Sequence, residues 1–179
     1  YLRKIWQDNT EEEALLGVSL TGIMDHPIMS GRKKQAELKQ WLTELKEEAI
    51  KTNKEWAERL GINVSTAITA VKPSGTVSQL VDSASGIHPR YSEQYVRRVR
   101  ADARDPLCGV LEAAGVPVED DVMSATTKVF SFPVKSPKDA IVATDMGAME
   151  QLKLWEIYQD YWCEHKPSMT CYYRDDEFL

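Results

Sequence analysis

The stretch that most constrains the fold is residues 72–78, Lys-Pro-Ser-Gly-Thr-Val-Ser, which directly follows a β-type segment at residues 65–71. Pro73 lacks an amide hydrogen and has a fixed φ angle, so a strand has to end there. Gly75 tolerates a positive φ and lets another group approach the backbone closely. The sequence therefore predicts a strand that turns sharply into a short helix at residues 77–81.

Such a turn can bind an anion. Ser74, Thr76 and Ser78 provide hydroxyl donors, and the first amides of a helix add unpaired N–H groups at the positive end of its dipole. The alternative is a turn in which Ser74 or Thr76 only caps the helix. Taken alone, the motif favours capping, because it is short and lacks the Gly-Lys-Ser/Thr ending of a nucleotide P-loop.

The rest of the pattern predicts an α/β protein. Residues 17–23 are typical of a buried strand or its exit loop, and residues 32–60 of a long amphipathic helix that Gly61 ends. Further strands are expected at 95–100, 127–134 and 169–173, with helices at 106–114 and 144–165. The final strand, helix and strand predict a βαβ unit with parallel strands and a right-handed crossover.

Composition limits the class of protein. A chain of 179 residues with 42% hydrophobic residues can bury one core, so a single domain is expected. The 28 acidic and 22 basic residues give a net charge of −6, which argues against binding nucleic acid or a membrane surface. Three cysteines without disulfide or zinc spacing suit a reducing cytoplasm. We expect neither secretion nor membrane insertion, and because both ends look cut, we expect a piece of a larger protein.

A set of short motifs occurs in collinear order over essentially the whole chain. They are Gly17–Gly22, Pro73–Ser78, Ser85–Tyr91, Tyr95–Arg100, Asp105–Leu107, Val129–Val134 and Pro167–Thr170. Together they resemble the large catalytic subunit of ribonucleotide reductases. More narrowly, they resemble the adenosylcobalamin-dependent (class II) enzymes, and among these the monomeric ribonucleoside-triphosphate reductases.

This resemblance implies a fold and an activity. The chain would be the C-terminal portion of a ten-stranded α/β barrel of the ribonucleotide reductase and glycyl-radical enzyme type, with parallel strands and crossover helices. The full enzyme would be an oxidoreductase of deoxyribonucleotide biosynthesis and DNA replication that converts ribonucleotides to 2′-deoxyribonucleotides by thiyl-radical chemistry. Adenosylcobalamin would be its cofactor, a ribonucleoside di- or triphosphate its substrate, and a thioredoxin-type protein its reductant.

The resemblance also assigns site residues. By their place in the family's motif, Ser74, Gly75, Thr76, Val77 and Ser78 would bind the substrate phosphates. The segment would then hold the ribose close to the radical cysteine. Combined with the resemblance, the turn is better explained by anion binding than by capping alone.

Several of the family's catalytic groups have no counterpart in this chain. They are the thiyl-forming cysteine, the pair of reducing cysteines and the Asn-Pro-Cys-Gly/Ala-Glu segment. We therefore expect no catalytic residue and no metal ligand here, and we expect the segment alone to be inactive. Cys108, Cys163 and Cys171 are expected to be buried structural thiols.

Four other residues are accessory candidates. His88 and Arg90 could approach a phosphate or the cofactor, but a loop-stabilising hydrogen bond is the favoured role for His88. Tyr172 and Tyr173 resemble a tyrosine pair that relays a radical in diferric reductases. Strand packing is favoured for them, because a cobalamin enzyme forms its radical beside the cysteine and needs no relay.

An alternative from another class is a non-catalytic, helix-rich protein-interaction module in which the helix at 32–60 docks a partner. It predicts that Trp41 and Trp56 lie on an exposed apolar face. A diferric or anaerobic glycyl-radical reductase is a second enzyme alternative. It is less favoured because residues 88–91 and 97–100 resemble the cobalamin group more.

Overall fold

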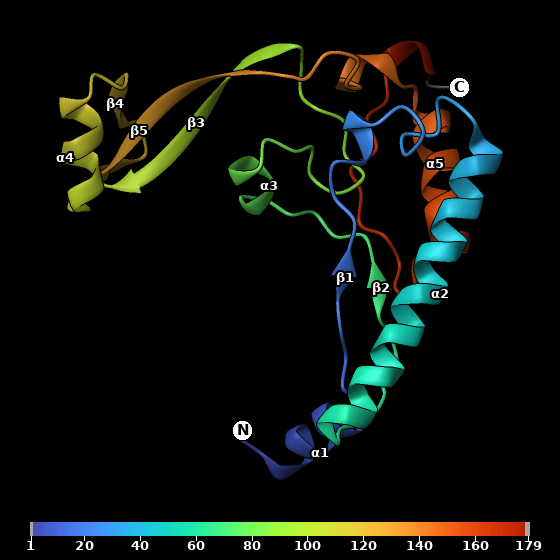
Figure 1. The fold of residues 1–179 in the computed structure, drawn as a ribbon. Helices are drawn as coiled ribbons and strands as arrows, with labels where there is room; N and C mark the ends of the chain where they lie inside the picture. The colour runs from blue at the N-terminus through green and yellow to red at the C-terminus, as the bar shows by residue number, and fades with distance from the viewer. Residues whose placement is uncertain (1, 178–179) are drawn as a thin grey trace. The chain divides into compact units, whose positions relative to one another are not determined.

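The computed structural model describes residues 2–177, which fall into two compact units. The main unit consists of the chain up to residue 90 and from residue 138 onward, and the sheet unit consists of residues 91–137. Figure 1 draws the elements of both units.

Two parallel strands, β1 (Val18–Ser19) and β2 (Thr69–Ala70), lie side by side in the main unit (Figure 1). Main-chain hydrogen bonds continue this ladder beyond the assigned strands, for example from the Leu16 amide to the Ala67 carbonyl at 3.2 Å. Both extended segments predicted for this part of the sequence are therefore confirmed. β1 is exposed rather than buried, and among residues 2–177 β2 is its only strand partner.

The chain passes from β1 to β2 through the long helix α2 (Gln35–Leu60), so these three elements form a βαβ unit. The helix ends as predicted, because Gly61 adopts a φ of 67° and its amide bonds back to the last turn. The side chains that α2 buries are Leu38, Leu42 and Ala57. A parallel βαβ unit is thus present, but at a different place from the one predicted.

The core of the main unit lies between α2, α5 (Ala148–Tyr161) and the intervening loops. Among its most deeply buried side chains are Ile23, Met24, Leu38, Leu42, Val71, Tyr158 and Trp162. The shorter elements are α1 (Lys4–Glu13), η1 (Ile23–Asp25), α3 (Val77–Leu80), η2 (Ala143–Asp145) and η3 (Asp175–Glu177). The helices predicted at 77–81 and 144–165 correspond to α3 and α5.

The strand predicted at residues 169–173 is wrong, because these residues form no strand. They lie beside α5, where the amide and the carbonyl of Tyr172 both bond to the side chain of Gln151, at 3.2 and 3.0 Å. A glutamine side chain has both an acceptor oxygen and a donor NH2 group, so it can pair with the amide and the carbonyl that Tyr172 would otherwise direct to a neighbouring strand. The βαβ unit predicted for the last third of the sequence is therefore wrong as well.

The sheet unit is an antiparallel sheet with one helix. Its elements are β3 (Gln94–Asp102), α4 (Pro106–Ala113), β4 (Val118–Asp121) and β5 (Ser124–Lys135). β5 lies between β3 and β4 and is antiparallel to both. The carboxylate of Asp105 accepts the Leu107 amide at 2.9 Å and caps α4, as the Asp-Pro pair predicts. The two predicted strands exist here, but neither is parallel.

Candidate functional site

The candidate site is the turn at residues 73–78, between β2 and α3. Gly75 has a φ of 55°, and a Cβ atom there would meet nothing within 4 Å, so glycine is needed for conformation rather than for space. The Val77 amide closes the turn by donating to the Ser74 carbonyl at 3.1 Å. Within the described residues, the amides of Gly75 and Thr76 donate to no protein acceptor, and both residues are exposed. The turn therefore offers two unpaired donors.

The three hydroxyls of the turn lie in different surroundings. Ser78 is fully buried, and its hydroxyl lies 3.5 Å from the Gly75 carbonyl, so it braces the turn from inside. Thr76 is exposed and its side chain does not cap α3. The hydroxyl of Ser74 bonds to Thr21 and Ser85 rather than to the helix. Neither Ser74 nor Thr76 therefore caps α3 through its side chain.

A loop at residues 82–90 lies against the turn. The hydroxyl of Ser85 accepts the Ser74 amide at 2.9 Å and lies 3.3 Å from the Ser74 hydroxyl. Gly86 has a φ of 55°, and a Cβ atom there would come within 2.7 Å of the Lys72 carbonyl oxygen. Only glycine lets the loop approach the turn this closely.

Thr21, in the segment after β1, connects the turn with this loop. Its hydroxyl donates to the Ala84 carbonyl at 2.9 Å and accepts the Gly86 amide at 3.0 Å. The same oxygen lies 3.2 Å from the hydroxyl of Ser74. Three separate segments of the chain therefore meet at one threonine.

Arg90 belongs to the loop but is buried, with a side chain that is 4% exposed. It forms a two-point ion pair with Asp25, at 2.8 and 3.0 Å, and a further ion pair with Asp82 at 2.9 Å. Hydrogen bonding to Asp25 raises the pKa of Arg90 above its ordinary value, against the opposing effect of burial. The guanidinium is thus already neutralised by two carboxylates.

His88 links the loop to the segment that follows α5. Its Nε2 atom accepts the Thr170 amide at 2.9 Å, so the ring proton is on Nδ1, which lies 3.1 Å from the Ser85 carbonyl oxygen. This arrangement agrees with the loop-stabilising hydrogen bond that was favoured from the sequence.

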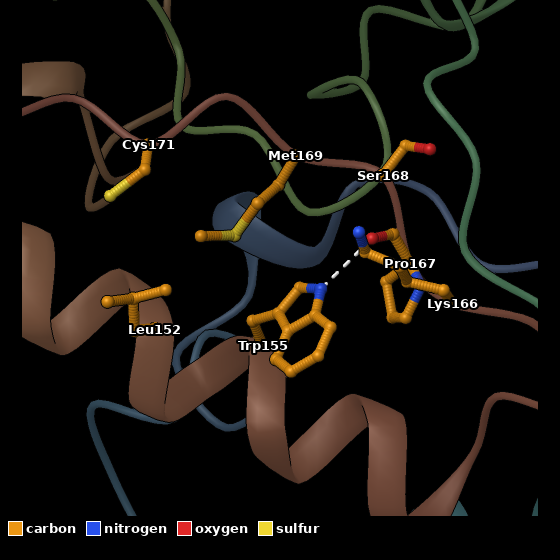
Figure 2. A pocket seen from close by; sticks show the side chains of 7 residues that line it. All are labelled: Leu152, Trp155, Lys166, Pro167, Ser168, Met169 and Cys171. Carbon is orange, nitrogen blue, oxygen red and sulfur yellow. Dashed lines mark hydrogen bonds between the residues drawn. The ribbon is translucent and has the colours of Figure 1, made fainter.

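The segment after α5 holds the remaining predicted residues. Tyr172 and Tyr173 are 45% and 67% exposed, and residues 169–173, to which they belong, form no strand in which they could pack. A hollow lies between α5 and residues 166–171, and neither tyrosine lines it. Figure 2 shows its lining residues, among which the indole nitrogen of Trp155 donates to the Pro167 carbonyl at 2.9 Å. This hollow involves none of the residues of the turn.

The cysteines are placed differently from one another. Cys108 and Cys163 are buried as expected, and burial raises the pKa of the Cys163 thiol to about 11. Cys171 is exposed, so the prediction of a buried thiol there is wrong. This error has the same cause as the wrong strand prediction at residues 169–173, because a segment outside a sheet has no neighbouring strand to cover the Cys171 side chain.

Among residues 2–177, no group of three or more histidine, cysteine, aspartate or glutamate side chains could hold a metal ion. No helix in the same part of the chain is both long and apolar enough to cross a membrane.

Sequence reasoning missed the residues that hold the turn, namely Thr21, Asp25 and Ser85. The only sequence signal for two of them is their place in motifs, because Thr21 lies in Gly17–Gly22 and Ser85 begins Ser85–Tyr91. Single hydroxyls have no spacing rule that would have connected them.

A scan against protein-family models finds no match. Curated relatives do match. The chain is 28% identical to the adenosylcobalamin-dependent ribonucleoside-triphosphate reductase of Lactobacillus acidophilus, in an alignment of 201 positions that covers 98% of the chain. It is 34% identical, over 133 residues and 72% of its length, to the enzyme of the same name from Levilactobacillus brevis. It covers 26% and 18% of these two relatives, so it spans about a quarter of their length or less.

The crystal structure of a B12-dependent (class II) ribonucleotide reductase matches 97% of the chain with a TM-score of 0.83, at 24% sequence identity. The chain corresponds to 28% of that protein. Its fold is therefore that of one part of such an enzyme. Taken with the named relatives, these matches show that the chain belongs to the adenosylcobalamin-dependent ribonucleotide reductase family, of which it represents one segment.

Proposed function

We propose that this chain is the C-terminal part of the catalytic barrel of an adenosylcobalamin-dependent ribonucleotide reductase, and that its turn at residues 73–78 binds the phosphates of the substrate. The observation that carries the proposal is the pair of unpaired, exposed amides of Gly75 and Thr76 beside the Thr76 hydroxyl. The relatives' names support a ribonucleoside phosphate as the ligand.

The residues of the turn have two kinds of role in this proposal. The amides of Gly75 and Thr76 and the hydroxyl of Thr76 donate to phosphate oxygens, because hydrogen bonds to an anion are the stronger kind. The hydroxyl proton of Ser74 is directed to Ser85 at 3.3 Å, so Ser74 holds the turn against the loop. Val77 and Ser78 act indirectly, since the Val77 amide closes the turn and the Ser78 hydroxyl braces it.

The contribution of this segment is binding rather than radical chemistry. A phosphate held at the turn fixes where the ribose lies, and orientation of this kind lowers the barrier to reaction at another group. The thiyl-forming and reducing cysteines then belong to other parts of the full protein. That protein would reduce a ribonucleoside di- or triphosphate in the cytoplasm and would be regenerated by a thioredoxin-type reductant.

Adenosylcobalamin is the cofactor in the names of the relatives, and it supplies the radical in such an enzyme. The residues described here do not fit as its holder. They contain no cluster of metal ligands, and both ring nitrogens of His88 are engaged by Thr170 and Ser85. We therefore assign the cofactor site to other parts of the full protein.

The test uses the full-length reductase that contains this chain. Thr76→Val removes the hydroxyl but keeps the β-branched shape, and it should raise the dissociation constant of a ribonucleoside triphosphate by about tenfold. The affinity for the same nucleoside without phosphates should not change. Equilibrium dialysis with the nucleoside, diphosphate and triphosphate measures both quantities and also identifies the preferred substrate.

Thr126→Val is the matched control, because Thr126 is exposed on β5 of the sheet unit. It should leave all three affinities unchanged. A Gly75→Ala variant strains the backbone at a φ of 55° and should weaken phosphate binding further. Triphosphate affinity that stays at the wild-type value in both turn variants would contradict the proposal.

A second candidate function is partner binding through α2. An apolar groove runs along this helix, and Trp56 in it is 52% exposed, whereas Trp41 is half-buried near His26. The rest of the full-length protein could equally cover this groove. Trp56→Glu should impair folding of the full protein if the face is internal, and should leave folding intact if a separate partner docks there.

A further inference from the structure

We infer that Arg90 and Asp25 are positioning residues for the phosphate-binding turn, acting through Ser85. This inference rests on the proposed function, because it assigns a role in shaping the same site. It differs from the sequence-based expectation that Arg90 itself approaches a phosphate.

The first step is the grip of Arg90 on the start of the loop. Its guanidinium bonds to Asp82 twice, to the carboxylate at 2.9 Å and to the carbonyl oxygen at 2.6 Å. Asp82 has a φ of 47°, a left-handed conformation that costs energy for a residue with a side chain. The two bonds from the buried Arg90 hold the loop in this unfavourable conformation.

The second step leads from Asp25 into the middle of the loop. One carboxylate oxygen of Asp25 bonds to Arg90 at 3.0 Å and also accepts the Ala84 amide at 2.7 Å. The Ala84 carbonyl accepts the Gly22 amide at 2.8 Å and the Thr21 hydroxyl at 2.9 Å. Ala84 is therefore fixed through both of its main-chain polar groups.

The third step reaches the turn. Ser85 lies between Ala84 and Gly86, and Gly86 is fixed in turn by the Thr21 hydroxyl. The hydroxyl of Ser85 receives the Ser74 amide at 2.9 Å, directly before the unpaired amides of Gly75 and Thr76. A shift of the loop would therefore move Ser74 and change the direction of the donors that follow it.

Burial of the ion pair supports a role in geometry. Removing two charges from water costs about as much as their attraction returns, so such a pair contributes little net stability compared with an apolar core. It does fix directions, because a guanidinium fork binds a carboxylate at two points. Lysine at position 90 would keep the charge but lose the two-point contact with Asp25.

The experiment is a double-mutant cycle in the full-length reductase. Arg90→Lys and Ser85→Ala should each raise the dissociation constant of the ribonucleoside triphosphate by roughly fivefold to tenfold. Affinity for the nucleoside should stay unchanged, and KM should rise while kcat at saturation is retained. Combining the two changes should add little beyond either one, because both act on Ser74.

Arg104→Lys is the control, since Arg104 is 85% exposed on its side chain and pairs with Asp102 in the sheet unit. It should change neither affinity. If Arg90→Lys lowers the melting temperature without changing triphosphate affinity, or if its effect adds fully to that of Ser85→Ala, the inference is wrong. If Arg90→Lys does not fold, Asp25→Asn, which keeps the shape and an acceptor for Ala84, gives the same measurement.

The Thr76→Val variant separates this inference from the proposed function. Weaker triphosphate binding in Thr76→Val but not in Arg90→Lys would overturn the positioning role alone. Unchanged binding in both variants would overturn the phosphate site itself.

Discussion

The main unit and the sheet unit are stabilised in different ways. The main unit contains the large buried cluster around Tyr158 and Trp162, although its assigned strands are only two residues long. The sheet unit has long antiparallel strands, but its buried hydrophobic side chains are only Cys108, Val129 and Phe130. The candidate site lies in the unit with less regular structure. Side-chain hydrogen bonds, rather than a repeating backbone ladder, therefore determine its shape.

The largest expected effects are losses of unfolding free energy when a core aromatic residue is removed, and they test whether the two units unfold independently. Trp162→Ala should destabilise the main unit by about 3–5 kcal/mol, because it opens a cavity and removes the 2.7 Å hydrogen bond to the Ala70 carbonyl, which keeps only the longer bond from the Leu20 amide at 3.4 Å. Phe130→Ala should cost the sheet unit a similar amount.

Urea denaturation of the 179-residue chain, followed by tryptophan fluorescence, measures this comparison. All five tryptophans belong to the main unit, so Phe130→Ala should leave the fluorescence transition in place while circular dichroism reports the loss of β-structure. A fluorescence midpoint that shifts with Phe130→Ala would show that the units unfold together.

The next effect concerns buried charge in the main unit. Arg90→Ala should destabilise this unit by about 3 kcal/mol, because it leaves the partly buried Asp25 without its partner. The same fluorescence titration provides the value. A loss below about 1 kcal/mol would mean that water reaches Asp25 and replaces the guanidinium.

A smaller effect depends on pH and involves Glu164, which pairs with the edge of β2 that has no neighbouring strand among the described residues. Burial raises the pKa of Glu164, but the amides of Thr69 and Ile68 and the Thr69 hydroxyl outweigh it and hold this pKa below its ordinary value of 4.5. The contribution of Glu164 to stability is therefore fully present above pH 4.5 and is lost as the pH falls through the lowered pKa.

Glu164→Gln provides the comparison, since it removes the charge and keeps an acceptor. The wild-type chain should be more stable than the variant at about pH 6, and the difference should narrow towards about pH 3. Unfolding midpoints measured across this range check the sign, and a difference that stays constant would contradict it.

The smallest effect belongs to the surface of the sheet unit. Arg98 pairs with Glu119, and both side chains are about half exposed. Arg98→Ala should therefore cost less than about 1 kcal/mol, and less still at high salt. Denaturation followed by circular dichroism at low and high salt measures this loss of stability. A larger loss that does not depend on salt would mean that the exposed Arg98 pair does not differ from the buried Arg90 pair.

The elements that sequence predicted correctly depend on local interactions. Gly61 ends α2 by its own conformation, and Asp105 caps α4 through an amide two residues away. The strand at 169–173 was predicted from aromatic and β-branched residues, whose preference for strands requires a neighbouring strand. The side chain of Gln151 provides the hydrogen bonds there instead, and no propensity scale includes that contact.

In the candidate site, too, features that depend on local interactions were predictable and contacts between distant residues were not. The turn was predictable because Pro73 and Gly75 act on their own backbone. Its supports were not, because Thr21 meets Ser74 across 53 positions of sequence and Arg90 meets Asp25 across 65. Such pairs become visible only when the chain has folded.

The meeting of three segments at the Thr21 hydroxyl has a consequence for engineering. A synthetic hexapeptide with the sequence of residues 73–78 would carry every group assigned to phosphate contact but none of the neighbours that orient them. Grafting this turn onto a foreign scaffold would therefore require transplanting the threonine and the glycine-containing loop together.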